Sequence, residues 1–468
     1  MDRGNQVIRV LSAERFTPFA LARKLNAVAM LESATFEGGR ARYSLLLVKQ
    51  AFRIRQNGSA VLYDDGTKRY SIKSSAKDIL DVLLYFANQH QAPKQDFPFP
   101  AGGIGYLSYE FARHFDTIAF SPKEDAFGMP EAEFIFAHVM VVFDHYSDLI
   151  YLIGLNYREK QIDLEAALVE TERAIGDLNF NYLQEDRAAY PLTAPDPDHD
   201  RDRYLLGVER VKEEIVAGNL LQGVLSRRVV VQTRLPAMEA YRRLRTANPA
   251  PYLVYLDFGT HQLFAASPEV HVKVKGDQAM MRPIAGTRPR GATDLEDKNL
   301  ERELLADEKE GAEHLMLVDL CRNDLGRVCE PGTVQVTESR AIERYSRVMH
   351  IVSQVKGRLA SGRTGVDAIR ATFPAGTVSG APKIRAIETI DGIEPRKRGF
   401  YAGIVAYLEP GGNLDSCITI RAALKRGDTL VLQAGAGIVF DSDPATEYTE
   451  TGLKLSALAR AIGLEVEQ

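Results

Sequence analysis

Hydrophobic and polar residues follow two different periods along this chain, and each period predicts one kind of element. Short apolar runs of strand length occupy residues 43–47, 134–143 and 149–155 in the first part of the chain. Residues 76–87 and 165–178 instead place their apolar side chains three or four positions apart, which is typical of an amphipathic helix. The first part of the chain is therefore predicted to contain several strands and a few helices.

The segment 187–203, RAAYPLTAPDPDHDRDR, interrupts this periodicity with three prolines and a dense cluster of charges, which indicates a linker. It separates a first unit, residues 1–190, from a second unit, residues 203–468. The second unit shows patterns for helices at 203–217 and 295–320, for strands at 224–233, 252–258 and 262–267, and for a closing helix that begins near Asp443 and Pro444. We therefore predict an α+β fold, with mixed sheets covered by helices on their outer faces.

Bulk properties narrow the class of protein. Of the 468 residues, 45% are hydrophobic and 26% are charged, as in a globular enzyme. The net charge of −5, without a long basic run, predicts no nucleic-acid partner. The apolar runs are too short to span a bilayer and the charged N-terminus lacks a signal core, so we expect no membrane association and a cytoplasmic location. Cys321, Cys329 and Cys417 are too scattered for a disulfide framework and are expected to be reduced, packed thiols.

Two acidic pairs in the second unit suggest a metal site. Glu310 and Glu313 lie in the predicted helix 295–320, and Glu447 and Glu450 lie in the closing helix. A spacing of three places both carboxylates of a pair on the same helix face, so two such faces turned toward each other would form an oxygen-rich cage. Carboxylate oxygens suit Mg²⁺, with an anionic substrate completing its coordination. Each pair taken alone is equally consistent with a solvated acidic helix face or with the helix macrodipole.

Glycine-rich turns near these helices can approach an anion closely. Gly435 and Gly437 precede the closing helix, and Thr377 lies in the turn FPAGTVSGAPK before another predicted helix. Ordinary structural turns explain these glycines equally well. The second turn does not match a P-loop, because Lys383 lacks the required glycine spacing, so nucleotide binding is disfavoured.

Two polar side chains stand among apolar residues predicted to form strands. Arg421 in DSCITIRAAL would be costly to bury without a carboxylate, which could be a substrate or a structural ion-pair partner. His350 in RVMHIVSQVKG is consistent with a hydrogen-bonded core histidine, and also with a general acid near neutral pH.

Six motifs in order give these residues a context. They are PIAGTRPRG (283–291), AEHLMLVDLCRNDLGRV (312–328), MHIVS (349–353), FPAGTVSGAPK (373–383), DSCITIRAA (415–423) and QAGAGIV (433–439). Together they resemble the chorismate-utilising enzyme family, and most closely its anthranilate synthase component I branch. The likeness is densest over residues 203–462 and extends more weakly to MLESA (30–34) and GGIGYLSYEFARHF (102–115). It implies the chorismate-binding fold, two large mixed or antiparallel β-sheets packed face to face with helices on the outside.

The resemblance implies a role for each candidate residue. Glu313 and Glu450 would be the principal Mg²⁺ carboxylates, supported by Glu310 and Glu447. The substrate chorismate would be bound by a further set of groups: Arg421, Tyr401, the backbone amides of Gly435 and Gly437, and the neighbouring residues Gln222, Ala285, Gly286 and Thr287. Thr377 would act from its turn, and His350 would help the ring hydroxyl leave. The implied reaction adds ammonia to chorismate and releases anthranilate and pyruvate.

Two positions distinguish this chain from other branches. Relatives that add water carry a lysine base where this chain has Gln222, and aminodeoxychorismate synthases often carry a nucleophilic lysine where it has Ala285. Both differences favour anthranilate synthase. Aminodeoxychorismate synthase component I remains an alternative, as does a catalytically silent subunit that only binds a ligand or a partner.

The resemblance also implies regulation and a partner. MLESA and NPAPYLVY resemble the segments that form a tryptophan feedback site, which assigns Glu32, Ser33, Pro251 and Tyr252 to inhibitor binding. None of the cysteines lies in the nucleophile turn of a glutamine amidotransferase. Ammonia is therefore expected to come from a separate glutamine amidotransferase subunit.

Overall fold

The computed structural model describes residues 5–33, 42–73, 75–94, 96–123, 127–177, 179, 190–193, 198–345 and 348–464. Its strands are β1 (Gln6–Ser12), β2 (Ala29–Glu32), β3 (Tyr43–Asn57), β4 (Ala60–Asp64), β5 (Arg69–Ser71), β6 (Ile104–Leu107), β7 (Ala132–Asp144), β8 (Leu149–Leu155), β9 (Gln222–Gln232), β10 (Tyr252–Asp257), β11 (Gln262–Ser267), β12 (Val270–Lys275), β13 (Gln278–Met281), β14 (Ile284–Pro289), β15 (Gln335–Arg344), β16 (Val348–Arg358), β17 (Gly380–Ala381), β18 (Ile404–Leu408), β19 (Leu414–Ile418), β20 (Ala422–Arg426) and β21 (Thr429–Ile438).

The helices are α1 (Pro18–Lys24), α2 (Ile79–Ala87), α3 (Leu164–Gly176), α4 (Asp198–Val216), α5 (Ala237–Ala247), α6 (Asp294–Ala306), α7 (Glu308–Gly326), α8 (Gly365–Thr372), α9 (Lys383–Ile393) and α10 (Pro444–Ile462), with short 3-10 turns at Tyr109–His114, Gly376–Val378 and Pro410–Gly412. Long helices and an extensive sheet occur in one chain, which confirms the predicted α+β class.

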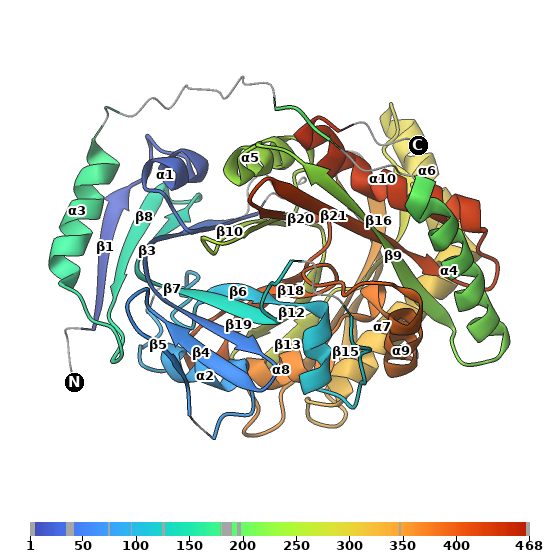
Figure 1. Cartoon of the computed structure of the whole chain (residues 1–468), viewed down its shortest axis with the longest axis horizontal. Coiled ribbons are helices and arrows are strands. Elements are labelled where there is room, and N and C mark those ends of the chain that lie inside the picture. Colours follow the sequence, from blue (N-terminus) through green and yellow to red (C-terminus); the bar gives the residue numbers. More distant parts are fainter. Residues whose placement is uncertain are drawn as a thin grey trace.

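The strands form two layers with a core between them. Figure 1 shows β9, β10, β20 and β21 in one layer and β6, β7, β18 and β19 in the other. Val254 of β10 and Leu424 of β20 belong to the same buried cluster as Phe134 of β7 and Val405 of β18. The layers are joined through β2, which pairs antiparallel with both β10 and β3, so that the described strands form one hydrogen-bonded network.

Helices cover the outer face of the first layer. Tyr255 of β10 and Leu432 of β21 point away from the central core and pack in a second cluster with Leu244 of α5 and Leu458 of α10. Neighbouring residues of one strand therefore face different cores, which is the period of two that a strand buried on both faces requires.

Strands from the first half of the chain pair directly with strands from the second half. β2 pairs with β10, and β6 pairs with β18 between Tyr106 and Val405. On its other edge β6 pairs with β7, and Gly105 permits that close approach, because a Cβ atom there would lie 2.0 Å from the Glu133 carbonyl oxygen of β7. The division into residues 1–190 and 203–468 stays a prediction, and the pairs β2–β10 and β6–β18 cross it.

Several predicted boundaries match closely. The runs 149–155 and 262–267 coincide with β8 and β11, and α10 begins after the N-cap Asp443 as predicted. The helix predicted at 203–217 begins earlier, at Asp198, within the predicted linker. Residues 187–189 and 194–197 of that linker, and Ala34 of MLESA, lie outside the described residues.

The helix predicted at 295–320 is two helices. Asp307 ends α6 and caps α7, where its carboxylate accepts hydrogen bonds from the amide N–H groups of Lys309 and Glu310. The residues buried in α7 also differ from what hydrophobicity alone suggests: Leu315 is 68% exposed, whereas His314 is buried and its Nε2 lies 2.7 Å from Ser353 Oγ. The apolar pattern continues through Asp307 and favours one unbroken helix. The Asp307 N-cap, with its two backbone hydrogen bonds, outweighs that pattern and begins a new helix.

The cysteines are buried and unpaired, as predicted. Within the described ranges, no helix combines the length and the hydropathy that crossing a membrane requires.

Candidate active site

The first acidic pair lies at the start of α7. Burial raises the pKa of Glu310, and the charge of Glu313 raises it further. Arg288 Nη1 opposes this rise from 3.4 Å, but the same guanidinium also binds Asp307 and Glu303. The Glu310 carboxylate is therefore only partly neutralised and can accept another cation.

The second pair lies at the start of α10 and is asymmetric. Glu447 is 8% exposed, and burial, together with the charge of Glu450, raises its pKa. Its Oε2 atom has no hydrogen-bond partner among the described residues. Glu450 is half-exposed and pairs with Lys454, which also donates a hydrogen bond of 3.0 Å to the Gly435 carbonyl. A buried carboxylate oxygen without a partner is costly unless a cation or a donor arrives.

Contacts near β9 connect the two pairs. Gln222 Nε2 donates to Glu313 Oε1 at 3.0 Å, and the same amide covers Gly437, where a Cβ atom would lie 2.6 Å from it. The charge of Lys309 on α7 also lowers the pKa of Glu447 on α10. The donors are hard carboxylate oxygens, which fits Mg²⁺. Among the described residues, however, no three acidic, histidine or cysteine side chains converge tightly enough to form a metal-binding group.

Arg421 occupies a strained turn and was wrongly predicted to lie on a strand. It lies between β19 and β20 with φ 51°, in the left-handed region that non-glycine residues rarely adopt. Burial lowers the pKa of its guanidinium, which makes no hydrogen bond or ion pair with any other described residue. A partly buried guanidinium without a partner among the described residues is suited to binding an anion.

Tyr401 lies beside Arg421 and the glycine strand β21. Burial raises the pKa of Tyr401 to about 12, partly opposed by nearby cations and by a hydrogen bond from the Gly435 amide. A Cβ atom on Gly435 would lie 2.8 Å from the Tyr401 hydroxyl oxygen. The absence of a side chain at Gly435 therefore permits this contact. Ala402, which follows Tyr401, has a left-handed backbone with φ 62°, as Arg421 does.

His350 lies on β16 directly opposite Thr287 of β14. The strand bulges at Gly286, with φ 65°, and the Gly286 carbonyl accepts a hydrogen bond of 3.0 Å from His350 Nδ1. Because a carbonyl can only accept, the proton is on Nδ1 and the lone pair of the neutral ring is on Nε2. Burial lowers the pKa of His350, so the ring is neutral at neutral pH. Ala285 lies on β14, next to Gly286, and pairs with Ile351 of β16.

Glu269 is a candidate residue that the sequence motifs did not reveal. It lies between β11 and β12 and is 7% exposed, beside the Thr377 hydroxyl. Burial raises its pKa to about 8, although Thr377 and the charge of Arg421 oppose the rise. A lone carboxylate among apolar residues in AASPEVHV is the signal that could have indicated it.

The four residues of the predicted regulatory site line one cavity of about 420 Å³: Glu32, Ser33, Pro251 and Tyr252. Glu32 is held in its wall by Arg245, with contacts of 2.7 and 2.8 Å, and by the Tyr241 hydroxyl at 2.9 Å. The Tyr252 hydroxyl donates to Asp415 Oδ1 at 2.9 Å. The cavity therefore brings together segments that lie far apart in the sequence.

This cavity also reaches toward the candidate active site. Tyr345 is part of its lining, and the Tyr345 ring centroid lies 5.5 Å from that of His350. A ligand in the cavity would therefore be one side chain away from His350.

The chain matches a known enzyme family over most of its length. A family profile described as chorismate binding enzyme matches residues 33–460. The chain therefore belongs to the family of chorismate binding enzymes.

Its relatives identify the branch. "Anthranilate synthase component 1" of Spirochaeta aurantia is 60% identical over 462 residues, covering 98% of this chain and 96% of that protein. "Anthranilate synthase component 1" of Pseudomonas putida is 40% identical over 451 residues, with coverages of 93% and 90%. The crystal structure of anthranilate synthase component I from Streptococcus pneumoniae TIGR4 matches with a TM-score of 0.80 and 37% identity, covering 89% of this chain and 92% of that chain. Within its family, this chain belongs with the anthranilate synthase component I enzymes, and the predicted resemblance is confirmed.

Proposed function

We propose that this chain converts chorismate and ammonia to anthranilate and pyruvate in the cytoplasm, as a step of tryptophan biosynthesis that depends on Mg²⁺. The observation that carries the proposal is the unpaired guanidinium of Arg421. Its charge lowers the pKa values of Tyr401, His350 and Glu269, so these candidate groups lie within electrostatic reach of one cation that can bind an anion. Chorismate is a small dicarboxylate, which suits that cation.

Substrate binding follows from the groups around Arg421. The guanidinium would pair with one carboxylate of chorismate, and the Tyr401 hydroxyl with the amides of Gly435 and Gly437 would bind it further. Gln222, Ala285, Gly286 and Thr287 would line the ring. Neither Ala285 nor Gln222 offers an amine, so this pocket lacks the lysine chemistry of the neighbouring branches, and the aminodeoxychorismate alternative is not favoured.

The two acidic pairs are the groups that would hold Mg²⁺. Glu313 and Glu450 would be the principal carboxylates, with Glu310 and Glu447 acting directly or through water. The unpartnered Oε2 of Glu447 supports this assignment. When bound, Mg²⁺ supplies positive charge that stabilises a substrate carboxylate and the departing oxygen.

Proton transfer would be divided between two residues. Ammonia attacks the ring carbon next to the carboxylate-bearing carbon, and the allylic hydroxyl leaves as water after accepting a proton. With a pKa of about 8, Glu269 retains its proton at neutral pH and is the better donor, assisted by Thr377. His350 is neutral with a free lone pair on Nε2, so it would remove the ring proton as the enolpyruvyl group departs and becomes pyruvate.

A partner and an inhibitor complete the proposal. Ammonia would be supplied by a glutamine amidotransferase subunit, in keeping with the word "component" in the relatives' names. Tryptophan would bind in the cavity lined by Glu32, Ser33, Pro251 and Tyr252 and would inhibit the enzyme.

The test is to incubate the purified chain with chorismate, MgCl₂ and an ammonium salt at mildly alkaline pH, and to identify the products by mass and fluorescence. We expect anthranilate from the wild type and a large loss with Arg421→Met, which keeps most of the side-chain volume but removes the charge. An amino-chorismate product without pyruvate would contradict the proposal.

A further inference from the structure

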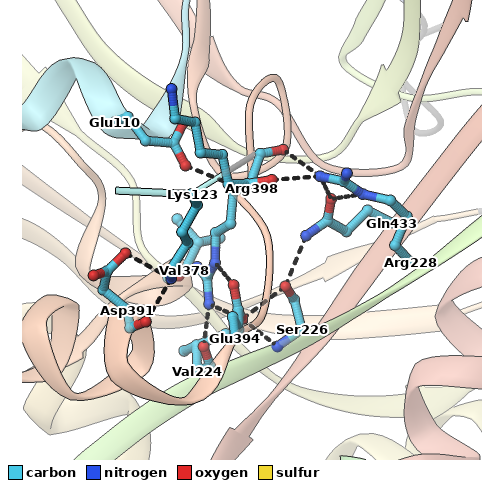
Figure 2. A network of polar contacts seen from close by, with 11 residues as sticks. Glu110, Lys123, Val224, Ser226, Arg228, Val378, Asp391, Glu394, Arg398 and Gln433 are labelled. Atoms are coloured by element: carbon cyan, nitrogen blue, oxygen red, sulfur yellow. Dashed lines mark hydrogen bonds and ion pairs between the residues drawn. The ribbon is translucent and has the colours of Figure 1, made fainter. Parts of the chain in front are cut away.

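Arg398 is a buried arginine that the proposed reaction leaves unused. It is 2% exposed and lies between α9 and Tyr401. Its guanidinium donates to both oxygens of Glu394 at 2.9 and 2.8 Å, to the Val378 carbonyl at 2.7 Å and to the Val224 carbonyl. Figure 2 shows Arg398 in the middle of this polar network, with its guanidinium end among these three partners. Its donors are thus nearly all satisfied by groups from separate segments.

Those partners adjoin the candidate active site. Val378 directly follows Thr377, and Val224 lies two residues after Gln222 on β9. Glu394 Oε1 also accepts hydrogen bonds of 2.8 Å from both the amide and the hydroxyl of Ser226. Arg398 therefore fixes the Thr377 turn, strand β9 and the end of α9 relative to one another.

The backbone of Arg398 is fixed as firmly as its side chain. Glu110 accepts hydrogen bonds from the amide of Arg398 at 2.6 Å and from the amide of Gly399 at 3.1 Å. On the other side, Arg228 donates to the carbonyls of Lys397 and Arg398, at 2.6 and 3.2 Å. Figure 2 shows the contacts of Glu110 and of Arg228 with Arg398. The peptide three residues before Tyr401 is therefore held from two directions.

The guanidinium also lies near two tyrosine rings. Its Cζ atom is 4.5 Å from the ring centroid of Tyr109 and 5.7 Å from that of Tyr401. A cation at this distance is attracted by the ring and favours the phenol as a hydrogen-bond donor. Arg398 can thus act on Tyr401 both by placing the main chain and by its charge.

We propose that Arg398 is a positioning residue, which acts through Tyr401 to set the geometry in which the carboxylates of chorismate are bound. The inference rests on the proposed function, because it takes chorismate as the ligand of Tyr401. Lysine could not replace Arg398, since it offers one compact charge where the site requires a planar fork for four acceptor atoms.

The test measures chorismate affinity by calorimetry, without ammonia, for the wild type, Arg398→Lys, Tyr401→Phe and the double variant. We expect Arg398→Lys to weaken chorismate binding about tenfold and to raise KM far more than it lowers kcat. In the Tyr401→Phe background the same substitution should have a much smaller effect, because residues that act as one unit are not additive.

Lys123→Met is the matched control. Lys123 forms a buried ion pair with Asp391 in the same network, at 2.7 Å with both side chains 9% exposed, but it does not contact Tyr401. The Lys123→Met substitution should lower the unfolding temperature and leave chorismate affinity unchanged. If the role of Arg398 were merely structural, Arg398→Lys would give the same result as Lys123→Met.

Glu110→Gln serves if the Arg398 variants fail to fold. It preserves the shape of Glu110 and leaves the guanidinium intact, but one of its two acceptors becomes a donor facing a backbone N–H. Weaker chorismate binding is expected here too. If Arg398→Lys or Glu110→Gln binds chorismate with wild-type affinity while Tyr401→Phe binds it weakly, this inference is overturned and the proposed function is not affected. A wild-type chain that does not bind chorismate would overturn the proposed function, and this inference with it.

Discussion

At the scale of single residues, the site depends on charges placed where the fold does not neutralise them. Among the described residues, the Arg421 guanidinium has no hydrogen-bond or ion-pair partner and one oxygen of Glu447 has no hydrogen-bond partner, while Glu269 retains a proton near neutral pH. Each arrangement costs stability, and such groups concentrate where a ligand completes them. The residue-scale claim is that chorismate and its cation are those missing partners.

Glu269 gives this claim a pH dependence. Its pKa is raised from 4.5 to about 8, so the native state holds a proton that the unfolded state has lost over this interval. The contribution of Glu269 to stability is therefore complete below pH 4.5 and is lost as pH rises toward 8. Since the protonated form of Glu269 would be the acid, we expect the kcat of the wild type to fall above about pH 8. The Glu269→Gln variant should have a low kcat that does not fall in this pH range.

Glu133→Gln is the matched control for that profile. Glu133 is 1% exposed and burial raises its pKa to about 7, but it lies on β7 away from Arg421. Its substitution should leave the kcat profile unchanged. If the alkaline limb persists in Glu269→Gln, the proton belongs to another group.

The motifs revealed some of these residues and missed others for a physical reason. His350, Thr377 and Arg421 lie in motifs whose order along the chain is specific. The role of Glu269 depends on burial between segments far apart in the sequence, and its local signal is only one carboxylate among apolar residues, without a spacing that would single it out. Burial of that kind is a tertiary property.

At the scale of elements, the positions of the acids depend on two helix starts. The start of α10 could be predicted because aspartate followed by proline is a strong local signal. The start of α7 was missed because the apolar pattern continues through Asp307, although aspartate is itself a good N-cap. The structure places Glu310 and Glu447 in the first turns of their helices, where the helix N-terminus also favours negative charge, and their partners Glu313 and Glu450 one turn further along.

This arrangement predicts which carboxylates matter. Glu313→Gln and Glu450→Gln should each lower anthranilate formation by about two orders of magnitude, because they remove a principal metal carboxylate. Part of the loss should be recovered at high Mg²⁺ concentration. The measurement is the initial rate as a function of MgCl₂.

Glu308→Gln provides the control on the same helix. Glu308 is exposed in the first turn of α7, and its substitution should change the rate by less than about twofold. Unchanged Mg²⁺ dependence in both Glu313→Gln and Glu450→Gln would remove these acids from the metal site.

At the scale of the whole molecule, the two halves of the chain are built into one network. The pairs β2–β10 and β6–β18 join residues that lie far apart in the sequence, Glu32 with Leu253 and Tyr106 with Val405, which no local pattern could predict. The layered α+β class was predictable, because it follows from alternating elements and from the resemblance. The contact between β2 and β10 also creates the cavity that Glu32 and Tyr252 share.

That cavity predicts an inhibitor effect separable from catalysis. Ser33→Leu would fill part of the 420 Å³ space, so tryptophan should bind about tenfold more weakly, while the ammonium-dependent rate stays near that of the wild type. Because the chain contains no tryptophan, binding can be followed by the emission of the added amino acid.

Ser147→Leu tests for a general effect of the added side chain. Ser147 is exposed in the turn between β7 and β8, so tryptophan affinity should not change. Equal affinity of the wild type and Ser33→Leu would place the inhibitor elsewhere.

The central claim is that the site around Arg421 joins the nitrogen of ammonia to the ring of chorismate and then expels pyruvate. The most direct measurement supplies nitrogen-15 ammonium with chorismate and MgCl₂ to the purified chain, and quantifies both products by mass spectrometry. The account predicts anthranilate carrying the heavy nitrogen and an equal amount of pyruvate. Heavy nitrogen in a product that still carries its enolpyruvyl group, or no incorporation at all, would contradict it.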